Sequence, residues 1–371
     1  MDRDTVDVYE GRAQDWVDQK IRPIPASLAA FAARVPSGAF RLDLACGPGW
    51  HTHGLGSPAI ACDAAKAMLD LVPRYAPDAP RVVADLEMLP FARGALGGAW
   101  AHKCYMHIAA DRVPLALADL HRAMQVGGAL HIHLTSDRLR ADFDDPFAGR
   151  HFDGWPLPRL IDVVIGAGFT IESTFDDGEE WIDVEATRAR TLADTVGTDM
   201  RLLIVGLNPS EYSADAGHGF ARPGNRFWPA ALEAGIVTRA HDPVHALRVD
   251  RIGMTDLVKR ATPRADNLTR DEFVQGAARL DRLVRWLEPR ATCFVGLSGY
   301  RAAIDRKAGA GWQSNPFGGR PVYVMPNTSG VNAHAKPKDL AAHLEAAAGA
   351  APPFPDSREG EVGEGRTVGP K

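Results

Sequence analysis

An asparagine stands where a parallel β-sheet usually presents its functional groups. Asn208 follows the apolar run 202–205 in "LLIVGLNPS", and this run predicts a buried strand with polar residues at its carboxyl end, a common place for a site. An amide does not act as a general base at neutral pH, but it orients water by hydrogen bonds. A positioned water is sufficient where the leaving group is already stabilised, as in the N-glycosidic bond of uracil or of thymine in a mispair.

The residues after Asn208 suit a pocket for a planar base. Phe220 offers a ring for stacking, and Gly217 and Gly219 allow the backbone to approach a ligand closely. Basic residues near this stretch and in "TDLVKRATPRAD" are candidates for phosphate contacts, with an ordinary basic surface as the alternative. These residues are Arg222, Arg226, Lys259, Arg260 and Arg264.

A second set of candidates lies in the first half of the chain. "DLACGPG" begins with Asp43 and joins a predicted strand to the next segment through a tight turn at Gly47 and Gly49. Asp63 ends the strand "AIACD", where a carboxylate would accept hydrogen bonds from ribose hydroxyls, and Asp85 ends a third strand. This ordered set predicts a nucleotide-type cofactor site.

The elements that position these residues form two successive α/β patterns. Strand-like runs such as "FRLDLACG" and "GALHIHLTS" alternate with helical patterns, which predicts a largely parallel sheet, and the alternation restarts at "MRLLIVGLNPS". We expect one domain over residues 1–195, a connector near 189–199, a second domain over 199–347 and a disordered tail over 348–371, rich in Pro, Gly and Glu.

Composition limits the class of protein. The chain has 371 residues, 45% of them hydrophobic and 24% charged, without an apolar stretch that could cross a membrane or a secretory signal, so we expect a cytoplasmic protein. Four Cys residues without a CxxC pair favour reduced thiols, and we expect no metal site. Residues 1–198 carry a net charge of −9 and residues 199–347 of +5, so the second half is the better suited to nucleic acid.

Over roughly residues 39–135 the chain resembles the class I S-adenosylmethionine-dependent methyltransferases. The resemblance rests on "DLACGPG", "AIACD", "ADLEMLPF" and "LADLHRAMQVGGALHIHL". It implies a Rossmann-like domain that binds S-adenosylmethionine, with Gly47 and Gly49 against the methionine part, Asp63 on the ribose and Asp85 near the adenine. Ala45 stands where the family often has Gly, and "WHTHGLGSP" is short for the family's first helix.

Over most of residues 200–345 the chain resembles the mismatch-specific uracil/thymine-DNA glycosylases. Three ordered motifs carry the resemblance: "GLNPS…GFARPGNRFW", "GMTDLVKRATPRADNL" and "VMPNTSG". It implies a three-layer α/β/α fold in which Asn208 positions the water and Phe220 stacks on the base. Further residues implied for the base pocket are Ser210, Ser213 and Asn327, and those for the wedge that enters the DNA helix are Gly330, Val331 and Asn332.

The second resemblance also implies the substrate, which is double-stranded DNA with a G·U or G·T mispair, and often etheno-cytosine. No lyase step is expected, because no Lys is an evident Schiff-base nucleophile. Ser210 stands where Gly is common in the family, and Ala333 and His334 replace an expected Arg after the wedge, which leaves the choice of opposite base open.

Three functions therefore stay open. The chain is a monofunctional glycosylase fused to a methyltransferase-like domain, or primarily a methyltransferase that the second domain delivers to DNA, or a protein that binds damaged bases without excising them. Nothing in the sequence indicates a methyl acceptor, a protein partner or the oligomeric state, and the first domain could instead serve only as a scaffold.

Overall fold

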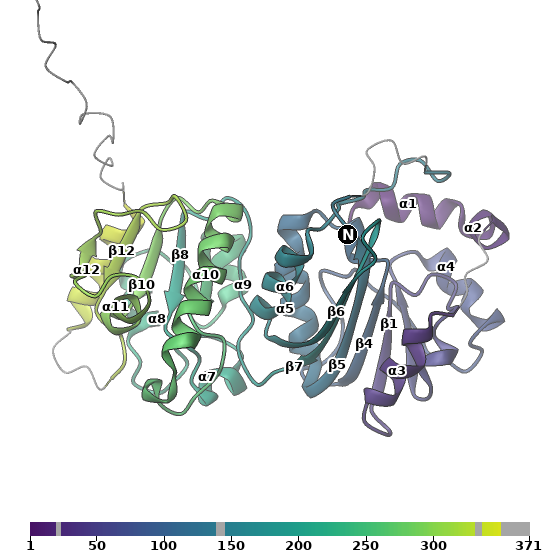
Figure 1. The fold of residues 1–371 in the computed structure, drawn as a ribbon, viewed down its shortest axis with the longest axis horizontal. Coiled ribbons are helices and arrows are strands. Elements are labelled where there is room, and N and C mark those ends of the chain that lie inside the picture. Colours follow the sequence, from purple (N-terminus) through teal and green to yellow (C-terminus); the bar gives the residue numbers. More distant parts are fainter. Residues whose placement is uncertain (20–23, 139–144, 331–335, 350–371) are drawn as a thin grey trace, which may run out of the picture.

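A computed structural model describes residues 1–19, 24–138, 145–330 and 336–349. Within these residues the chain forms a seven-stranded and a five-stranded sheet, each with helices on its faces, as Figure 1 shows. The predicted α/β class and the order of a Rossmann-like domain followed by a glycosylase-like three-layer domain are confirmed. Most of the predicted disordered tail, from residue 350 on, lies outside the described residues.

The first sheet has the strand order β3-β2-β1-β4-β5-β7-β6. Its first five strands in this order are parallel, whereas β7 is antiparallel to both β5 and β6, as expected for the edge of the sheet. The strands are β1 (Phe40–Leu44), β2 (Ala59–Asp63), β3 (Arg81–Val83), β4 (Leu96–His102), β5 (Met124–Thr135), β6 (Phe169–Asp176) and β7 (Trp181–Arg188).

Helices cover both faces of the first sheet. They are α1 (Arg3–Gly11), α2 (Ala13–Gln19), α3 (Ala26–Arg34), α4 (Lys66–Leu71), α5 (Val113–Ala123) and α6 (Leu157–Gly166). In Figure 1, α5 and α6 lie on the side of the sheet that faces the second sheet. The segment "WHTHGLGSP" forms only a short 3-10 turn over His53–Leu55, in agreement with its short pattern. Sequence patterns did not identify α1–α3.

The second sheet has the order β11-β12-β10-β8-β9, and only β11 is antiparallel to its neighbour. Apolar clusters lie on both faces, which gives the three layers. The strands are β8 (Leu202–Gly206), β9 (Ile252–Asp256), β10 (Thr292–Val295), β11 (Gly311–Trp312) and β12 (Val322–Met325). The helices are α7 (Glu211–Ala216), α8 (Phe227–Glu233), α9 (Pro243–Arg248), α10 (Arg270–Leu287), α11 (Leu297–Ala303) and α12 (Pro337–Ala348).

The two halves are docked through side chains and through the connector. Trp155 packs edge-on against Trp286 of α10 at 6.1 Å between ring centroids. Thr195 pairs with Met254 of β9, so the connector extends the edge of the second sheet. Asp194, 2% exposed, accepts hydrogen bonds from Lys259, Arg279 and Thr255 at 2.6–2.8 Å.

No helix in the described part of the chain combines the length and the apolar character needed to cross a membrane.

Candidate functional site

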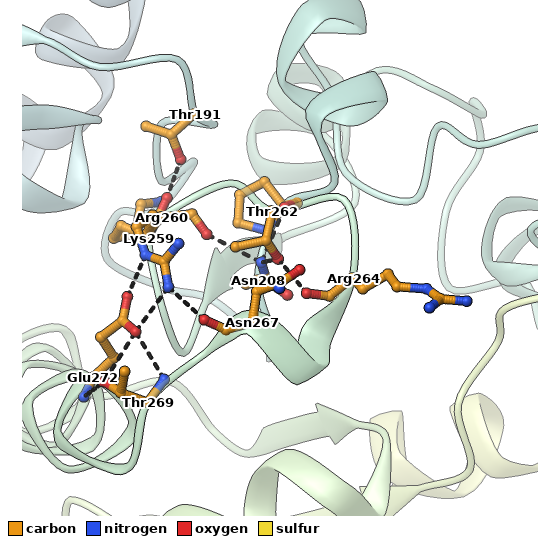
Figure 2. A network of polar contacts seen from close by, with 10 residues as sticks. Thr191, Asn208, Lys259, Arg260, Thr262, Arg264, Asn267, Thr269 and Glu272 are labelled. Carbon is orange, nitrogen blue, oxygen red and sulfur yellow. Dashed lines mark hydrogen bonds and ion pairs between the residues drawn. The ribbon is translucent and has the colours of Figure 1, made fainter.

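The amide of Asn208 is held in one orientation by its nitrogen (Figure 2). Nδ2 donates to Oγ1 of Thr262 at 2.8 Å, to the backbone oxygen of Arg260 at 3.0 Å and to that of Pro209 at 3.1 Å. Among the described residues no hydrogen bond reaches Oδ1. The fixed nitrogen therefore leaves the oxygen as an oriented acceptor at the carboxyl end of β8.

The loop between β9 and α10 supplies this support. Thr262 is buried, and its Oγ1 donates in turn to the backbone oxygen of Arg264 at 2.8 Å. The guanidinium of Arg260 contacts both carboxylate oxygens of Glu272 at 2.5 and 2.9 Å and the backbone oxygen of Asn267 at 2.8 Å, as Figure 2 shows. Because Glu272 belongs to the capping box that begins α10, the loop is fixed to that helix.

The two predicted pocket serines hold the turn that leads to Phe220. Ser210 is the N-cap of α7: its Oγ accepts from the backbone nitrogen of Ser213 at 3.1 Å and contacts Oγ of Ser213 at 3.0 Å. Ser213 is buried, and its Oγ accepts from the backbone nitrogen of Ala221 at 3.3 Å. Both hydroxyls thus have a structural part in shaping the loop.

Phe220 combines a strained backbone with a stacked ring. Its φ of +58° lies in the left-handed region, which is uncommon for a non-glycine residue and often marks a functional site. One face of its ring stacks on Phe227, with 4.1 Å between centroids and 19° between planes. A base that stacks on Phe220 would therefore use the other face.

The loop after β12 is tied to the loop that precedes α8. The backbone nitrogen of Arg226 donates to Thr328 and its Nη2 to the oxygen of Ser329, at 3.0 and 2.9 Å. Oδ1 of Asn327 accepts from the backbone nitrogen of Ser329 at 2.9 Å. A Cβ on Gly330 would lie 2.9 Å from the backbone oxygen of Gly224. The predicted wedge residues Val331 and Asn332 lie outside the described residues.

The candidate phosphate contacts divide into two groups. Lys259 is nearly buried and its ammonium pairs with Asp194 at 2.7 Å, while Arg260 is engaged by Glu272. Arg222 is exposed, with only a 3.5 Å contact to the oxygen of Pro263, and the side chain of Arg264 extends away from the network in Figure 2. Of these four residues, Arg222 and Arg264 are exposed and have no ion pair with another described residue.

Sequence patterns missed two residues at this edge, Thr262 and Asp256. Thr262 lies within "TDLVKRATPRAD", in which the basic residues were the evident candidates for function. Asp256 ends β9 beside Gly206, where a Cβ on the glycine would lie 2.3 Å from Oδ1 of Asp256. Burial raises the pKa of this carboxyl to about 6. Its position at a strand end was the signal available in the sequence.

The cofactor cradle of the first sheet presents buried carboxylates. Oδ2 of Asp63 accepts from the backbone nitrogen of Gly47 at 2.8 Å and Oδ1 from that of Ala65 at 2.9 Å, while burial raises the pKa of Asp63 to about 6. Asp43 accepts from Oγ1 of Thr52 at 2.6 Å, and burial raises its pKa to about 7. Gly47 has a φ of +55° and open space at its Cα.

The part of the cradle formed by Asp43, Gly47 and Asp63 fits a nucleotide-type cofactor. A cavity of about 90 Å³ is bordered by Asp43, Gly47 and Asp63 of the sheet edge and by Tyr9 and Trp16 of the N-terminal helices. Nδ1 of His102, buried at the same cavity, has no hydrogen-bond partner among the described residues. The site thus contains both acceptors and an unsatisfied polar atom that a ligand could meet.

Two predicted cofactor residues are placed differently. Gly49 packs against Val72, since a Cβ there would lie 3.1 Å from Cγ1 of Val72, so it is required by packing. The carboxylate of Asp85 contacts the amino group of Met1 at 2.6 Å. The strand end at Asp85, for which the resemblance implies a place near the adenine, therefore lies against the N-terminal segment.

Candidate metal ligands do not gather in the part of the chain that the structure describes: no group of three or more His, Cys, Asp or Glu side chains is placed to hold an ion.

Comparison with known families agrees with this division. Residues 193–348 match the uracil DNA glycosylase superfamily, and residues 42–132 match a methyltransferase domain family. The chain is therefore a fusion of a methyltransferase domain with a domain of the uracil DNA glycosylase superfamily.

Solved structures similar to this chain include S-adenosylmethionine-dependent methyltransferases. A TehB-like enzyme from Corynebacterium glutamicum is 22% identical, with 49% of this chain and 97% of that chain covered and a TM-score of 0.38. A 1,6-didemethyltoxoflavin-N1-methyltransferase from Burkholderia thailandensis is 19% identical, with 50% and 86% covered and a TM-score of 0.38. An enzyme from Mesorhizobium loti is 18% identical, with 43% and 96% covered and a TM-score of 0.37.

Proposed function

We propose that the second domain is a monofunctional DNA glycosylase that removes uracil or thymine mispaired with guanine, with etheno-cytosine as a further substrate. The observation that carries the proposal is Asn208, whose nitrogen is fixed by three acceptors while its oxygen stays available. Membership of the uracil DNA glycosylase superfamily supports it. The preference for the base opposite remains a prediction, as does the cytoplasmic location.

In the proposed mechanism Oδ1 of Asn208 accepts a hydrogen bond from a water molecule. This bond aligns the oxygen of the water with C1′ of the deoxyribose. The bond between C1′ and the base nitrogen breaks, and the base leaves with the electron pair while the sugar gains oxocarbenium character. Water then forms the new C1′–O bond, and its proton goes to solvent or to the base, because an amide does not take it. The product is an abasic site.

The remaining groups would recognise the flipped base and the DNA. Phe220 would stack on the base with the ring face not covered by Phe227. Of the candidate phosphate contacts we retain Arg222 and Arg264, because Lys259 and Arg260 are engaged in ion pairs within the protein. The wedge role of Gly330, Val331 and Asn332 stays part of the proposal.

The test is an excision assay under single-turnover conditions. Duplexes with G·U, G·T or G·etheno-cytosine are incubated with the full chain and then cleaved with alkali at abasic sites. Asn208→Ala should reduce the rate by about 10²–10³-fold, as for loss of one preorganised polar group, with DNA affinity retained. Asn267→Ala is the matched control, since Asn267 enters the network through its backbone oxygen. Absence of abasic product from every duplex would refute the proposal.

For the first domain we propose binding of S-adenosylmethionine, a carrier of an activated methyl group, with Asp63 on the ribose. Asp63 is oriented for this by the backbone nitrogens of Gly47 and Ala65. Calorimetry with S-adenosylmethionine on the intact chain and on Asp63→Ala tests the proposal. Lack of binding by the intact chain would exclude the rival in which methyl transfer is the main activity, and would favour a scaffold.

A protein that only binds damaged bases would give a different combination of binding and excision results. It would show tight binding to a mismatched duplex, measured by fluorescence anisotropy, without abasic product in the same sample.

A further inference from the structure

A cavity of about 270 Å³ lies between the two domains. Residues from the first domain, the connector and the second domain line it, including Leu115, Leu192, Phe220 and Met254. It meets the glycosylase edge at Phe220 and Asp256, whereas Asn208 does not line it. Neither proposed activity accounts for it.

One wall of this cavity carries a buried cation without a counter-ion. Arg188, at the end of β7, is only 6% exposed and lines the cavity. Its Nε donates to the backbone oxygen of His121 at 3.2 Å, and its two terminal nitrogens have no hydrogen-bond partner among the described residues. No carboxylate among those residues lies within ion-pair distance of Arg188. Buried charges in proteins are normally paired, so this guanidinium calls for an anion.

The neighbouring charges increase the need for an anion. Arg93 also lines the cavity, and its charge repels that of Arg188. The carboxylate of Asp215 attracts Arg188, but it already accepts hydrogen bonds from Nε and Nη2 of Arg190 at 2.8 and 2.6 Å. Burial and Arg93 together lower the pKa of Arg188. Among the described residues, the nitrogens of Arg93 donate to the backbone oxygens of Asp215 and Ala216 alone.

Three carboxyl side chains also line the cavity: Glu87 pairs with Arg112, Asp119 pairs with Arg122, and Asp256 ends β9. Most of the remaining lining is apolar. Leu115, Ala118, Leu192, Phe220 and Met254 all contribute to it. A ligand that satisfies this cavity must therefore combine a small oxyanion with an apolar body. A duplex phosphate is excluded on steric grounds, because Arg188 is almost fully covered.

We propose that the interdomain cavity is a binding site for a small organic anion, a phosphate or carboxylate that pairs with Arg188 and Arg93 and whose apolar part lies against Phe220 and Leu115. Binding requires no DNA, although the site shares Phe220 with the proposed base pocket. It would join the two domains through one ligand.

Calorimetry on the full chain, with phenyl phosphate and inorganic phosphate as probes, tests this site. We expect phenyl phosphate to bind with a Kd below about 1 mM and inorganic phosphate about tenfold more weakly, because it lacks the apolar body. Arg188→Met should weaken phenyl phosphate by at least about tenfold. The matched control is Arg285→Met, on the exposed side of α10 and paired with Asp281, which should change the Kd by less than about twofold.

A second variant protects the test against a folding defect in Arg188→Met. Ala118→Phe keeps the charges and fills the cavity, so it should also abolish binding of phenyl phosphate. An undamaged duplex should not compete with phenyl phosphate in the intact protein. The proposal is overturned if the intact chain binds neither probe up to about 10 mM, if Ala118→Phe binds as well as the intact chain, or if duplex DNA displaces the probe.

Discussion

The carboxyl ends of the parallel strands carry the carboxylates of Asp43 and Asp63 in the first domain, and the amide of Asn208 beside the carboxyl of Asp256 in the second. In the first, Asp43 and Asp63 are buried, and the carboxylate of Asp63 is held by backbone N–H donors. In the second, the hydrogen bonds run in the opposite direction, because Nδ2 of Asn208 donates to three oxygens. The first edge can therefore change with pH between 4 and 7. At the second edge the dipole of Asn208 does not titrate, although the pKa of the neighbouring Asp256 is raised by burial to about 6.

Each edge also contains a non-glycine residue in the left-handed conformation in the loop after its first strand, Ala45 with a φ of +53° and Phe220 with a φ of +58°. Lys103, after β4, is a second such residue at the first edge. Ala45 and Phe220 differ in the side chain that the strained backbone carries. Ala45 replaces a frequent glycine and has a small side chain, whereas Phe220 places a large ring beside the proposed base site. Strain at Phe220 therefore has a proposed use, and strain at Ala45 has none that the structure explains.

The largest expected effect comes from giving the second edge the chemistry of the first. Asn208→Asp places a carboxylate oxygen near three acceptors that now receive hydrogen bonds from Nδ2, so the loop should shift and excision should fall by about 10²-fold. Single-turnover excision of a G·U duplex measures this. A faster reaction would show instead that a general base is useful at this position, and would contradict the positioning role.

The reverse exchange, Asp63→Asn, should weaken S-adenosylmethionine by about tenfold. An amide has one oxygen, so it cannot accept from both Gly47 and Ala65 and also from a ribose. Calorimetry gives the Kd, and the excision rate of the same variant should be unchanged. An altered excision rate with intact folding would show that the two edges are coupled.

The cofactor affinity should depend on pH in one direction. Burial raises the pKa of Asp63 to about 6, so the ionised form that accepts ribose hydroxyls is lost as the pH falls through 6, and the Kd should rise by up to about tenfold per pH unit below it. Asp63→Asn should flatten this profile. A profile that persists in the variant would assign the titration to another group, of which Asp43 is the nearest candidate.

The pH dependence of folding has the opposite sign. Since the pKa values of Asp43 and Asp63 are raised above the ordinary 3.8, the folded state binds more protons than the unfolded state, and the free energy of unfolding should fall as the pH rises from 4 to about 7. Thermal unfolding across this range, with Asp43→Asn as the comparison, measures the effect. The variant should lose less stability over the same interval.

A smaller effect is expected from the support of Asn208. Thr262→Val removes one acceptor of Nδ2 while keeping the shape of the side chain, and excision should fall by about 3- to 10-fold. The matched control is Thr269→Val, which removes a hydroxyl from the capping box of α10 without a contact to Asn208. Equal losses in both variants would mean that the loop, rather than the amide, is affected.

The smallest effect should follow Ala45→Gly. Relief of the left-handed strain, less the added entropy of glycine in the unfolded chain, should raise the free energy of unfolding by up to about 1 kcal/mol. A melting temperature that rises by about 2 °C would agree with this. A decrease would indicate that the methyl group of Ala45 makes a favourable contact.

Strand patterns and strand-end residues were sufficient to predict much of this molecule. β1, β2, β8 and β12 follow apolar runs with polar ends, and the edge positions of Asp63 and Asn208 follow from parallel pairing. The partners of these side chains could not be predicted, because they depend on tertiary contacts. Lys259, for example, is basic and lies in a polar loop, yet it pairs with a carboxylate 65 residues earlier.

The N-terminal helices are a second example of tertiary contacts that the sequence does not predict. Nothing in the spacing of α1 and α2 indicates that Tyr9 and Trp16 border the cofactor cavity, since that contact exists only once the chain has folded back over the sheet. The approach of Arg93 to Gly217 is a further case. A Cβ on Gly217 would lie 1.6 Å from Nη2 of Arg93, the end of a flexible side chain, so it is mainly the φ of +81° that requires glycine here.

The carboxylate of Asp194 bears on whether the glycosylase domain is a portable module. A fragment that begins at residue 199 would retain Lys259 and Arg279 but lose the acid between them, and it would also lose the Thr195 pairing along β9. Recombination or protein engineering that moves this domain to another chain must therefore carry residues 191–198 with it. In structural terms, the chain between the two domains belongs to the second domain.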